Sequence, residues 1–139
     1  MKVVAGQEDL YQLSFNRGEK LMSSLNQFAR EYKIKGGQLT GLGAVNEVRL
    51  AYYDLKTKKY YDRIFNDCDY ELINFTGNLT LKDGFPFVHA HISISDHQFN
   101  TFSGHLMEAT VAILAEIFIT PLGVMPERKM NETIGLYEI

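Results

Sequence analysis

The chain has 139 residues, 45% of them hydrophobic, with 14 Lys and Arg against 17 Asp and Glu and a formal net charge of −3. This length and apolar content fit one compact domain spanning residues 1–139. The net negative charge argues against direct DNA binding, because basic residues that neutralise phosphate supply most non-specific affinity. The single cysteine, Cys68, excludes an intrachain disulfide and a cysteine-based zinc cluster.

Neither a secretory signal nor a membrane span is indicated. The N-terminal stretch MKVVAGQEDL has too few apolar residues for the core of a signal peptide. The longest apolar run, ATVAILAEIFITPLGVM, is interrupted by Glu116 and Pro121, and its β-branched residues favour a buried strand over a membrane helix. We therefore expect a cytoplasmic protein that does not associate with membranes.

The first predicted elements are a strand and a helix. Apolar and polar residues alternate over residues 11–15, which predicts a strand. The next apolar residues recur at steps of four, three and four, as on one face of a helix: Leu21, Leu25, Phe28 and Tyr32. This helix should begin near Gly18 and end at Gly36 and Gly37.

The remainder of the chain is predicted to be mostly strands. Strand patterns occupy residues 44–55, 69–81 and 110–119, and a last short strand closes the chain. The Asp-Gly in KDGFP marks a tight turn before FVHAHISIS. In that strand the apolar residues should face the core: Val88, Ala90, Ile92 and Ile94. One helix among many strands predicts an α+β fold, in which a principal helix packs on a mostly antiparallel sheet.

The histidines of FVHAHISIS are candidate metal ligands. His89 and His91 point to the same face of a strand, about 7 Å apart from two rises of roughly 3.3 Å. Catalytic zinc sites use three protein ligands, so a third must come from a neighbouring strand or chain. His105 is the candidate, since the chain returns through a turn and Gly104 allows close backbone approach. The alternative is a solvated strand face, with His97 exposed in the turn.

Two carboxylates are further candidates for this site. Glu116 interrupts an apolar strand, where a carboxylate is costly unless it is paired or hydrogen-bonded. It could serve as a ligand or as an outer hydrogen-bond partner of the histidine site. The alternative is a strand-end or interface carboxylate paired with Arg49 or Arg63. Glu108, just after GHLM, is expected to be solvated.

The glycines of KGGQLTGLGAVNEV do not form a nucleotide-binding loop. The dinucleotide fingerprint requires a strand before it and a helix after it, whereas here a helix precedes and a strand follows. These glycines are therefore interpreted as a tight connection that requires positive φ or close packing.

Five segments, taken in order, resemble one known family. LSFNRGEKLMSSLNQFAREYKIKGGQLTGLGAVNEVRL is similar to its strand, its glycine-started helix and its small-residue turn, TGLGAV. YELINFTGNL is similar to its strand ending in a Ser/Thr-Gly-Asn-Leu turn, and VHAHISIS, SGHL and the acid in AILAEIFI complete the set. The family is the PPC domain (plants and prokaryotes conserved), in its stand-alone prokaryotic form; in plants it follows the AT-hook of nuclear proteins.

The resemblance implies a homotrimer with a metal site. In the prokaryotic branch the corresponding histidines lie close together and hold a metal, commonly zinc; here they are His89, His91 and His105, and the family's strand acid falls on Glu116. The chain departs from the family in two respects. It has no Arg-Gly-Arg-Pro hook and no basic tail, which argues against minor-groove binding. Ser103 stands where the family usually has glycine.

Two functions follow from these observations. The first is a trimeric metal-binding domain in which the three histidines lie in a pocket for a small ligand. The alternative is a non-enzymatic module that binds protein partners, including transcriptional ones. Direct DNA binding ranks last because of the charge. No catalytic residue or reaction can be assigned from these patterns, so the sequence leaves open whether the chain is an enzyme.

Overall fold

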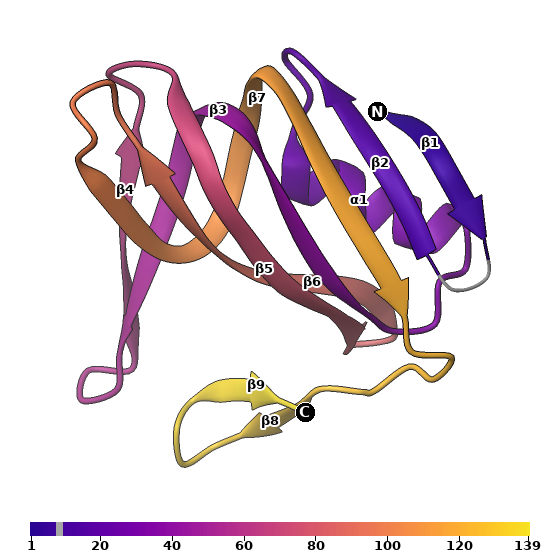
Figure 1. Cartoon of the computed structure of the whole chain (residues 1–139). Helices are drawn as coiled ribbons and strands as arrows, with labels where there is room; N and C mark the ends of the chain where they lie inside the picture. The colour runs from indigo at the N-terminus through magenta and orange to yellow at the C-terminus, as the bar shows by residue number, and fades with distance from the viewer. Residues whose placement is uncertain (8–9) are drawn as a thin grey trace.

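A computed structural model describes residues 1–7 and 10–139 of the chain. These residues form one helix and nine strands (Figure 1). In chain order the elements are β1 (Lys2–Gln7), β2 (Leu10–Asn16), α1 (Leu21–Glu31), β3 (Gly37–Asp54), β4 (Lys59–Phe65), β5 (Tyr70–Lys82), β6 (Phe85–Ser95), β7 (Thr101–Pro121), β8 (Lys129–Asn131) and β9 (Leu136–Glu138). The predicted α+β class is confirmed. The helix in the described part of the chain is too short to cross a membrane.

Four long strands form a closed ring of pairings. β3 pairs with β5, β5 with β6, β6 with β7, and β7 again with β3, all antiparallel. β4 extends this ring from β3, and β2 and β1 extend it from β7. β3 and β7 follow curved paths through the molecule (Figure 1). Their pairing is interrupted by register shifts between residues 43 and 50 of β3, and such bulges let a strand bend.

The glycines of β3 permit this close pairing. A Cβ atom on Gly41 would lie 2.5 Å from the carbonyl oxygen of Glu116 on β7, so only glycine fits there without a shift. The predicted close packing of this glycine-rich stretch is confirmed, whereas the predicted connection between two strands is wrong, because the stretch lies within the single strand β3.

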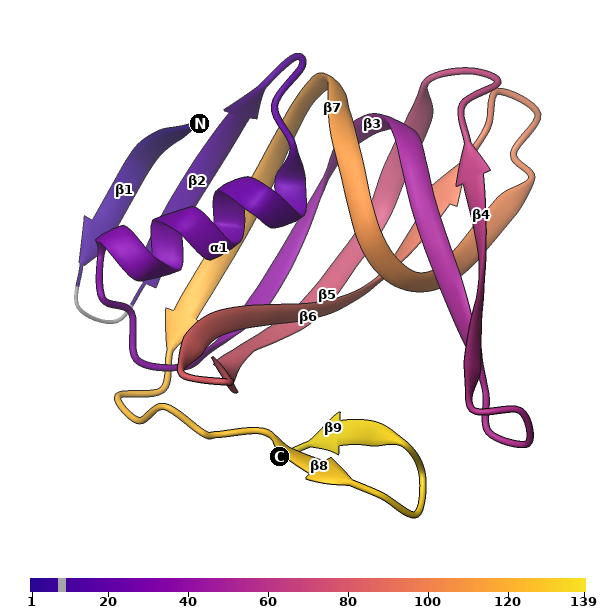
Figure 2. The same ribbon diagram turned by 180° about the vertical axis from the view of Figure 1, so that it is seen from behind.

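Helix α1 covers the face of β2 and β7 (Figure 2). Its buried residues include three of the four predicted ones, Leu21, Leu25 and Phe28. The fourth, Tyr32, is 52% exposed and follows the last helical turn. The helix ends at Glu31, earlier than the predicted stop at Gly36 and Gly37.

The early end of the helix has a local cause. Lys33 adopts a positive φ of 52°, and its N–H donates to the carbonyl of Arg30. The N–H of Ile34 donates to the carbonyl of Ala29. These two bonds form a Schellman motif, in which glycine is usual at the position that lysine occupies here. The glycine-based prediction therefore placed the stop too late.

The β5–β6 hairpin sets the position of the histidines. Asp83 and Gly84 both have positive φ, as the two-residue turn predicted from Asp-Gly requires. The turn pairs Lys82 with Phe85, and this register places His89 opposite Asn78. The predicted core face of β6 is confirmed: Val88, Ala90, Ile92 and Ile94 are all at most 2% exposed.

The last segment of the chain lies beside β5, next to the turn that joins β5 to β6. The β8–β9 hairpin forms a separate two-stranded sheet (Figures 1 and 2). It is attached through Leu81, whose N–H donates to the carbonyl of Pro126 and whose carbonyl accepts from the N–H of Arg128, both at 2.8 Å. The Tyr53 hydroxyl also donates to the carbonyl of Ile134 at 2.7 Å. The hairpin therefore forms one wall beside the histidine face.

Candidate metal centre

Three histidines from two neighbouring strands meet on one face of the sheet. His89 and His91 lie two residues apart on β6, so both point to the same side. His105 lies on β7 directly opposite His91 in the strand pairing. A Cβ on Gly104 would lie 3.2 Å from the carbonyl of Ala51, so the backbones are indeed close beside His105. His97, the fourth histidine, is exposed in the turn between β6 and β7, as predicted.

The donor atoms of these three side chains are close enough to share an ion. One ring nitrogen from each of His89, His91 and His105 lies within 4.8 Å of the other two. Their ring centroids are 4.9 to 5.4 Å apart. A tetrahedral zinc ion with Zn–N bonds of ~2.0–2.1 Å needs nitrogens about 3.4 Å apart. Small side-chain rotations would close the remaining gap, so the donor set fits a metal.

Burial favours the neutral, ligating form of two of these imidazoles. Burial, together with smaller contributions from the nearby His105, Arg128 and His91, lowers the pKa of His89 to about 4. Burial also lowers the pKa of His105, with smaller contributions from His91 and Arg128. Neutral imidazole is the form that binds metal, so at neutral pH neither ring needs to lose a proton first.

The same shift predicts how metal-free protein responds to acid. The folded-state pKa of His89, about 4, is below its ordinary value of 6.5. As pH falls from about 6.5 to about 4, the unfolded chain binds a proton that the folded chain does not, so stability is lost over this window. We expect His89→Asn to flatten this part of the stability profile, measured by urea unfolding in the presence of chelator. If the unfolding free energies of the wild type and of His89→Asn changed in parallel with pH over this window, the loss of stability could not be assigned to His89.

The three histidines open into a cavity of about 810 Å³. Its walls come from β3, β4, β5, β6, β7, helix α1 and the C-terminal segment; they include Asn26, Tyr53, Tyr60, Lys82, Phe87, Leu106, Arg128 and Tyr137. Tyr60 lies beside His105, with ring centroids 5.7 Å apart, and burial raises the pKa of its phenol. The cavity is large enough for a small organic molecule.

Glu116 does not join this site. It lies eleven residues beyond His105 on β7, where it pairs with Ser14 of β2 and Leu42 of β3, and it does not line the cavity. Nor does either predicted arginine pair with it. Arg49 forms an ion pair with Asp62 at 2.6 Å, and Arg63 lies over the ring of Phe65 at 4.6 Å.

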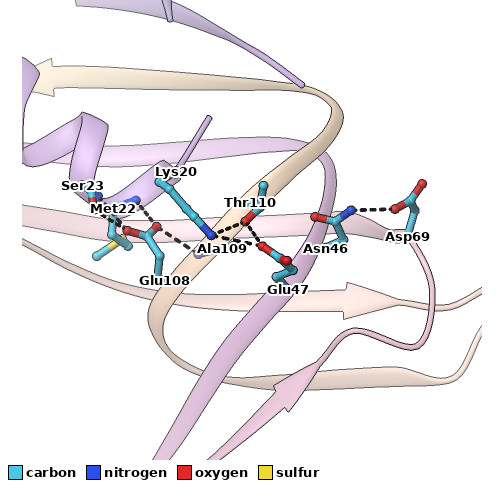
Figure 3. A network of polar contacts seen from close by, with 9 residues as sticks. All are labelled: Lys20, Met22, Ser23, Asn46, Glu47, Asp69, Glu108, Ala109 and Thr110. Carbon is cyan, nitrogen blue, oxygen red and sulfur yellow. Dashed lines mark hydrogen bonds and ion pairs between the residues drawn. The ribbon is translucent and has the colours of Figure 1, made fainter. Parts of the chain in front are cut away.

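Glu108, expected to be solvated, instead caps helix α1 (Figure 3). Its carboxylate accepts from the backbone N–H groups of Met22 and Ser23 at 2.8 and 3.1 Å, and from the Ser23 hydroxyl at 2.6 Å. Lys20, at the N-cap position, makes no side-chain capping bond. The long-range cap could not be read from local spacing, because the two partners lie 86 residues apart.

Arg128 is a site residue that sequence reasoning missed. It reaches the cavity from the C-terminal segment, and its guanidinium Nη2 lies 3.3 Å from Nδ1 of His89. Nothing in the local pattern around Arg128 distinguishes it from a surface arginine. Only the packing of residues 126–128 against β5 brings it to the histidines.

Solved structures similar to this chain are found in bacteria and archaea. A protein from Bacteroides thetaiotaomicron, provisionally described as DNA-binding, superposes with a TM-score of 0.91 at 28% identity, covering 96% of this chain and 92% of that one. A plant- and prokaryote-conserved protein from Pyrococcus horikoshii has a TM-score of 0.85 at 32% identity, covering 99% and 95%. A protein from Archaeoglobus fulgidus described as metal-containing has a TM-score of 0.86 at 29% identity, also covering 99% and 95%.

The family follows from the sequence match together with these structures. No curated protein matches the chain significantly. The family model of the Plants and Prokaryotes Conserved (PCC) domain, the PPC domain of the resemblance above, matches residues 3–123. The chain therefore belongs to the Plants and Prokaryotes Conserved domain family.

Proposed function

We propose that the chain is a metal-binding domain whose histidines 89, 91 and 105 hold one divalent ion inside a ligand-binding cavity. The observation that carries this proposal is the convergence of their three ring nitrogens within 4.8 Å. The description of the Archaeoglobus fulgidus relative as metal-containing supports it. Three protein ligands leave a coordination position open toward the cavity.

Zinc is the metal that we propose. Imidazole ligands suit zinc, copper, iron and nickel, and a site of three neutral histidines with one open position is a common zinc arrangement. No carboxylate lines the cavity in the part of the chain that the structure describes, so no acidic side chain is placed to act as a general base. We propose binding of a ligand in this cavity.

Metal analysis of the wild-type protein tests this function. The protein should be purified without a histidine tag, stripped with chelator and reconstituted with zinc. We expect one zinc per chain by plasma mass spectrometry, and a zinc-edge anomalous peak between the three histidines in crystals. A peak elsewhere, or substoichiometric uptake, would reject the proposal.

We further propose that the chain assembles as a homotrimer. The outer face of β3, β5 and β7 carries exposed apolar side chains around a shallow hollow: Leu42, Ile73, Ile113 and Leu114, which are 46 to 62% exposed. A contiguous apolar patch of this kind commonly marks a protein interface. Its location on the sheet leaves the histidine cavity on another part of the surface, since the two hollows share no lining residue.

A single charge on this patch should dissociate the assembly. Ile113, 62% exposed, would place a carboxylate in the proposed interface when replaced by glutamate. We expect a trimer for the wild type and a folded monomer for Ile113→Glu by light scattering after size exclusion. Leu55→Glu, at an exposed site in the β3–β4 turn, is the matched control and should remain trimeric. A monomeric wild type would refute the proposal.

The alternative function is a non-enzymatic module that binds protein partners, including transcriptional ones. The provisional description of the relatives from Bacteroides thetaiotaomicron and Ralstonia eutropha as DNA-binding proteins favours it. Because the net charge of the chain is −3, we rank direct DNA binding below contact with DNA through a partner protein.

Two assays separate this alternative from the metal function. Partners that remain captured after chelation and with His89→Ala would support an interaction module in which the histidines are structural. A mobility shift at low salt tests DNA contact directly. We expect no retained complex, because salt-sensitive phosphate contacts need a basic surface.

A further inference from the structure

The cavity holds a buried arginine that has no acidic partner. Arg128 is 8% exposed. Its guanidinium donates to the Thr80 hydroxyl at 2.9 Å, the Asn78 side-chain oxygen at 2.9 Å and the Tyr137 carbonyl at 3.1 Å. All three acceptors are neutral, and no carboxylate within residues 1–7 and 10–139 forms an ion pair with it. A charge buried among neutral groups is costly unless a counter-charge joins it.

The surroundings of Arg128 add positive potential. Lys82 also lines the cavity, with its ammonium over the rings of Tyr137 and Phe87 at 4.3 and 5.1 Å. Among the described residues that line the cavity, none is Asp or Glu. A chain with a net charge of −3 thus places cationic side chains around this cavity. Such a concave surface of one sign attracts ligands of the opposite charge.

The contact between Arg128 and His89 is incompatible with a metal on His89. A guanidinium only donates, so Nδ1 of His89 must accept at 3.3 Å. If a metal took Nδ1, that lone pair would be used. If it took Nε2, neutral Nδ1 would carry a proton and face a donor. In either case one N–H of Arg128 is released and requires a new acceptor within the cavity.

We propose that this cavity binds a small organic anion, with its carboxylate or phosphate group on Arg128 and its apolar body along Phe87 and Leu106. The inference rests on the proposed function, because it uses the same cavity and the release of Arg128 by the metal. Burial lowers the pKa of Arg128, which agrees with an environment that lacks its counter-charge. The cavity of about 810 Å³ accommodates a ligand of this size.

Matched fluorinated probes test the charge requirement. Binding of 4-fluorobenzoate, 4-fluorophenyl phosphate and neutral 4-fluorobenzamide is followed by ¹⁹F NMR on zinc-loaded and metal-free protein. We expect at least one of the two anions to bind zinc-loaded protein about tenfold or more tightly than the amide, because a charge-assisted hydrogen bond is lost with the amide. The anion that binds more tightly shows whether the cavity prefers a carboxylate or a phosphate group. Equal binding of all three probes would overturn the inference.

Variants show whether Arg128, rather than the metal, recognises the anion. Arg128→Met should reduce anion affinity about tenfold and leave amide binding unchanged. Arg17→Met removes the same charge from an exposed site outside the cavity and should have no effect. An anion preference that survives in folded Arg128→Met protein would overturn the inference.

A crystal of wild-type protein soaked with 4-bromobenzoate provides a test that needs no variant. The bromine anomalous signal fixes the direction of the ligand. We expect the carboxylate at Arg128 and the bromine toward the cavity mouth; the reverse orientation would reject the inference.

The outcomes of these experiments separate the metal function from the anion site. If zinc is not taken up while the anion preference persists on metal-free protein, the proposed metal function fails and Arg128 recognition stands. If zinc binds without any anion preference, only the present inference fails.

Discussion

Replacing any of the three clustered histidines with alanine should lower zinc affinity by at least about a hundredfold. Loss of a group that merely orients a ligand typically costs about 10–100-fold in metal affinity, so loss of a direct ligand should cost more. Each of His89, His91 and His105 provides one of the three donor atoms that lie within 4.8 Å of one another. A competition titration against a chromophoric chelator measures the affinity of each variant.

The chain contains its own matched control for this experiment. His97 is the fourth histidine and is exposed in the turn between β6 and β7. His97→Ala should retain wild-type affinity and stoichiometry, because its side chain is not among the three clustered donors. The assignment would be wrong if His97→Ala weakened binding as much as the others, or if all three cavity variants still bound zinc like the wild type.

Local patterns predicted the histidine face well because β6 is regular. Its period of two fixes which residues share a face, and the Asp-Gly turn fixes the register with β5. The core residues from Val88 to Ile94 and the outward direction of His89 and His91 follow from this alternation alone. The pairing of His91 with His105 required the partner strand, for which the turn between β6 and β7 was the available signal.

β5 shows where such reasoning fails. Strict alternation along this strand would place Tyr70 and Leu72 on one face and Ile73 and Phe75 on the other. In the structure Phe75 is fully buried together with Tyr70 and Leu72, while Ile73 is 58% exposed. A register shift between Leu72 and Asn74 changes the phase of the strand. A bulge inserts one residue and reverses the faces beyond it, and no turn residue marks it in the sequence.

The polar environment of the site was also beyond local patterns. Arg128 and Glu108 each act on residues far away in the sequence, on His89 and on the start of helix α1. Glu116 attracted attention because a carboxylate stands out in an apolar strand, yet it lies away from the cavity. An unusual residue type signals a local cost, whereas its partner is determined by the tertiary fold.

Glu108→Ala should destabilise the fold by about 2–3 kcal/mol, because it removes the cap of the only helix in the described part of the chain. Loss of an N-cap costs about 0.5–2 kcal/mol, and hydrogen bonds to a charged group contribute about 1.5–3 kcal/mol. A negative charge at this end also interacts favourably with the helix dipole. The free energy of unfolding in urea is the appropriate measurement.

Two further variants separate capping from a general effect of charge. Glu108→Gln keeps the size of the side chain and one acceptor oxygen, so it should lose about half as much stability, since neutral hydrogen bonds are worth about 0.5–1.5 kcal/mol. Glu132→Ala removes an equal charge from an exposed position in the β8–β9 turn, outside both hollows, and should change stability by no more than about 0.5 kcal/mol. If Glu108→Ala were as mild as Glu132→Ala, the capping bonds would contribute nothing net. Helix α1 also supplies Asn26, whose side-chain oxygen accepts from the N–H of Val88 at 2.9 Å, so the cap supports the strand that carries His89.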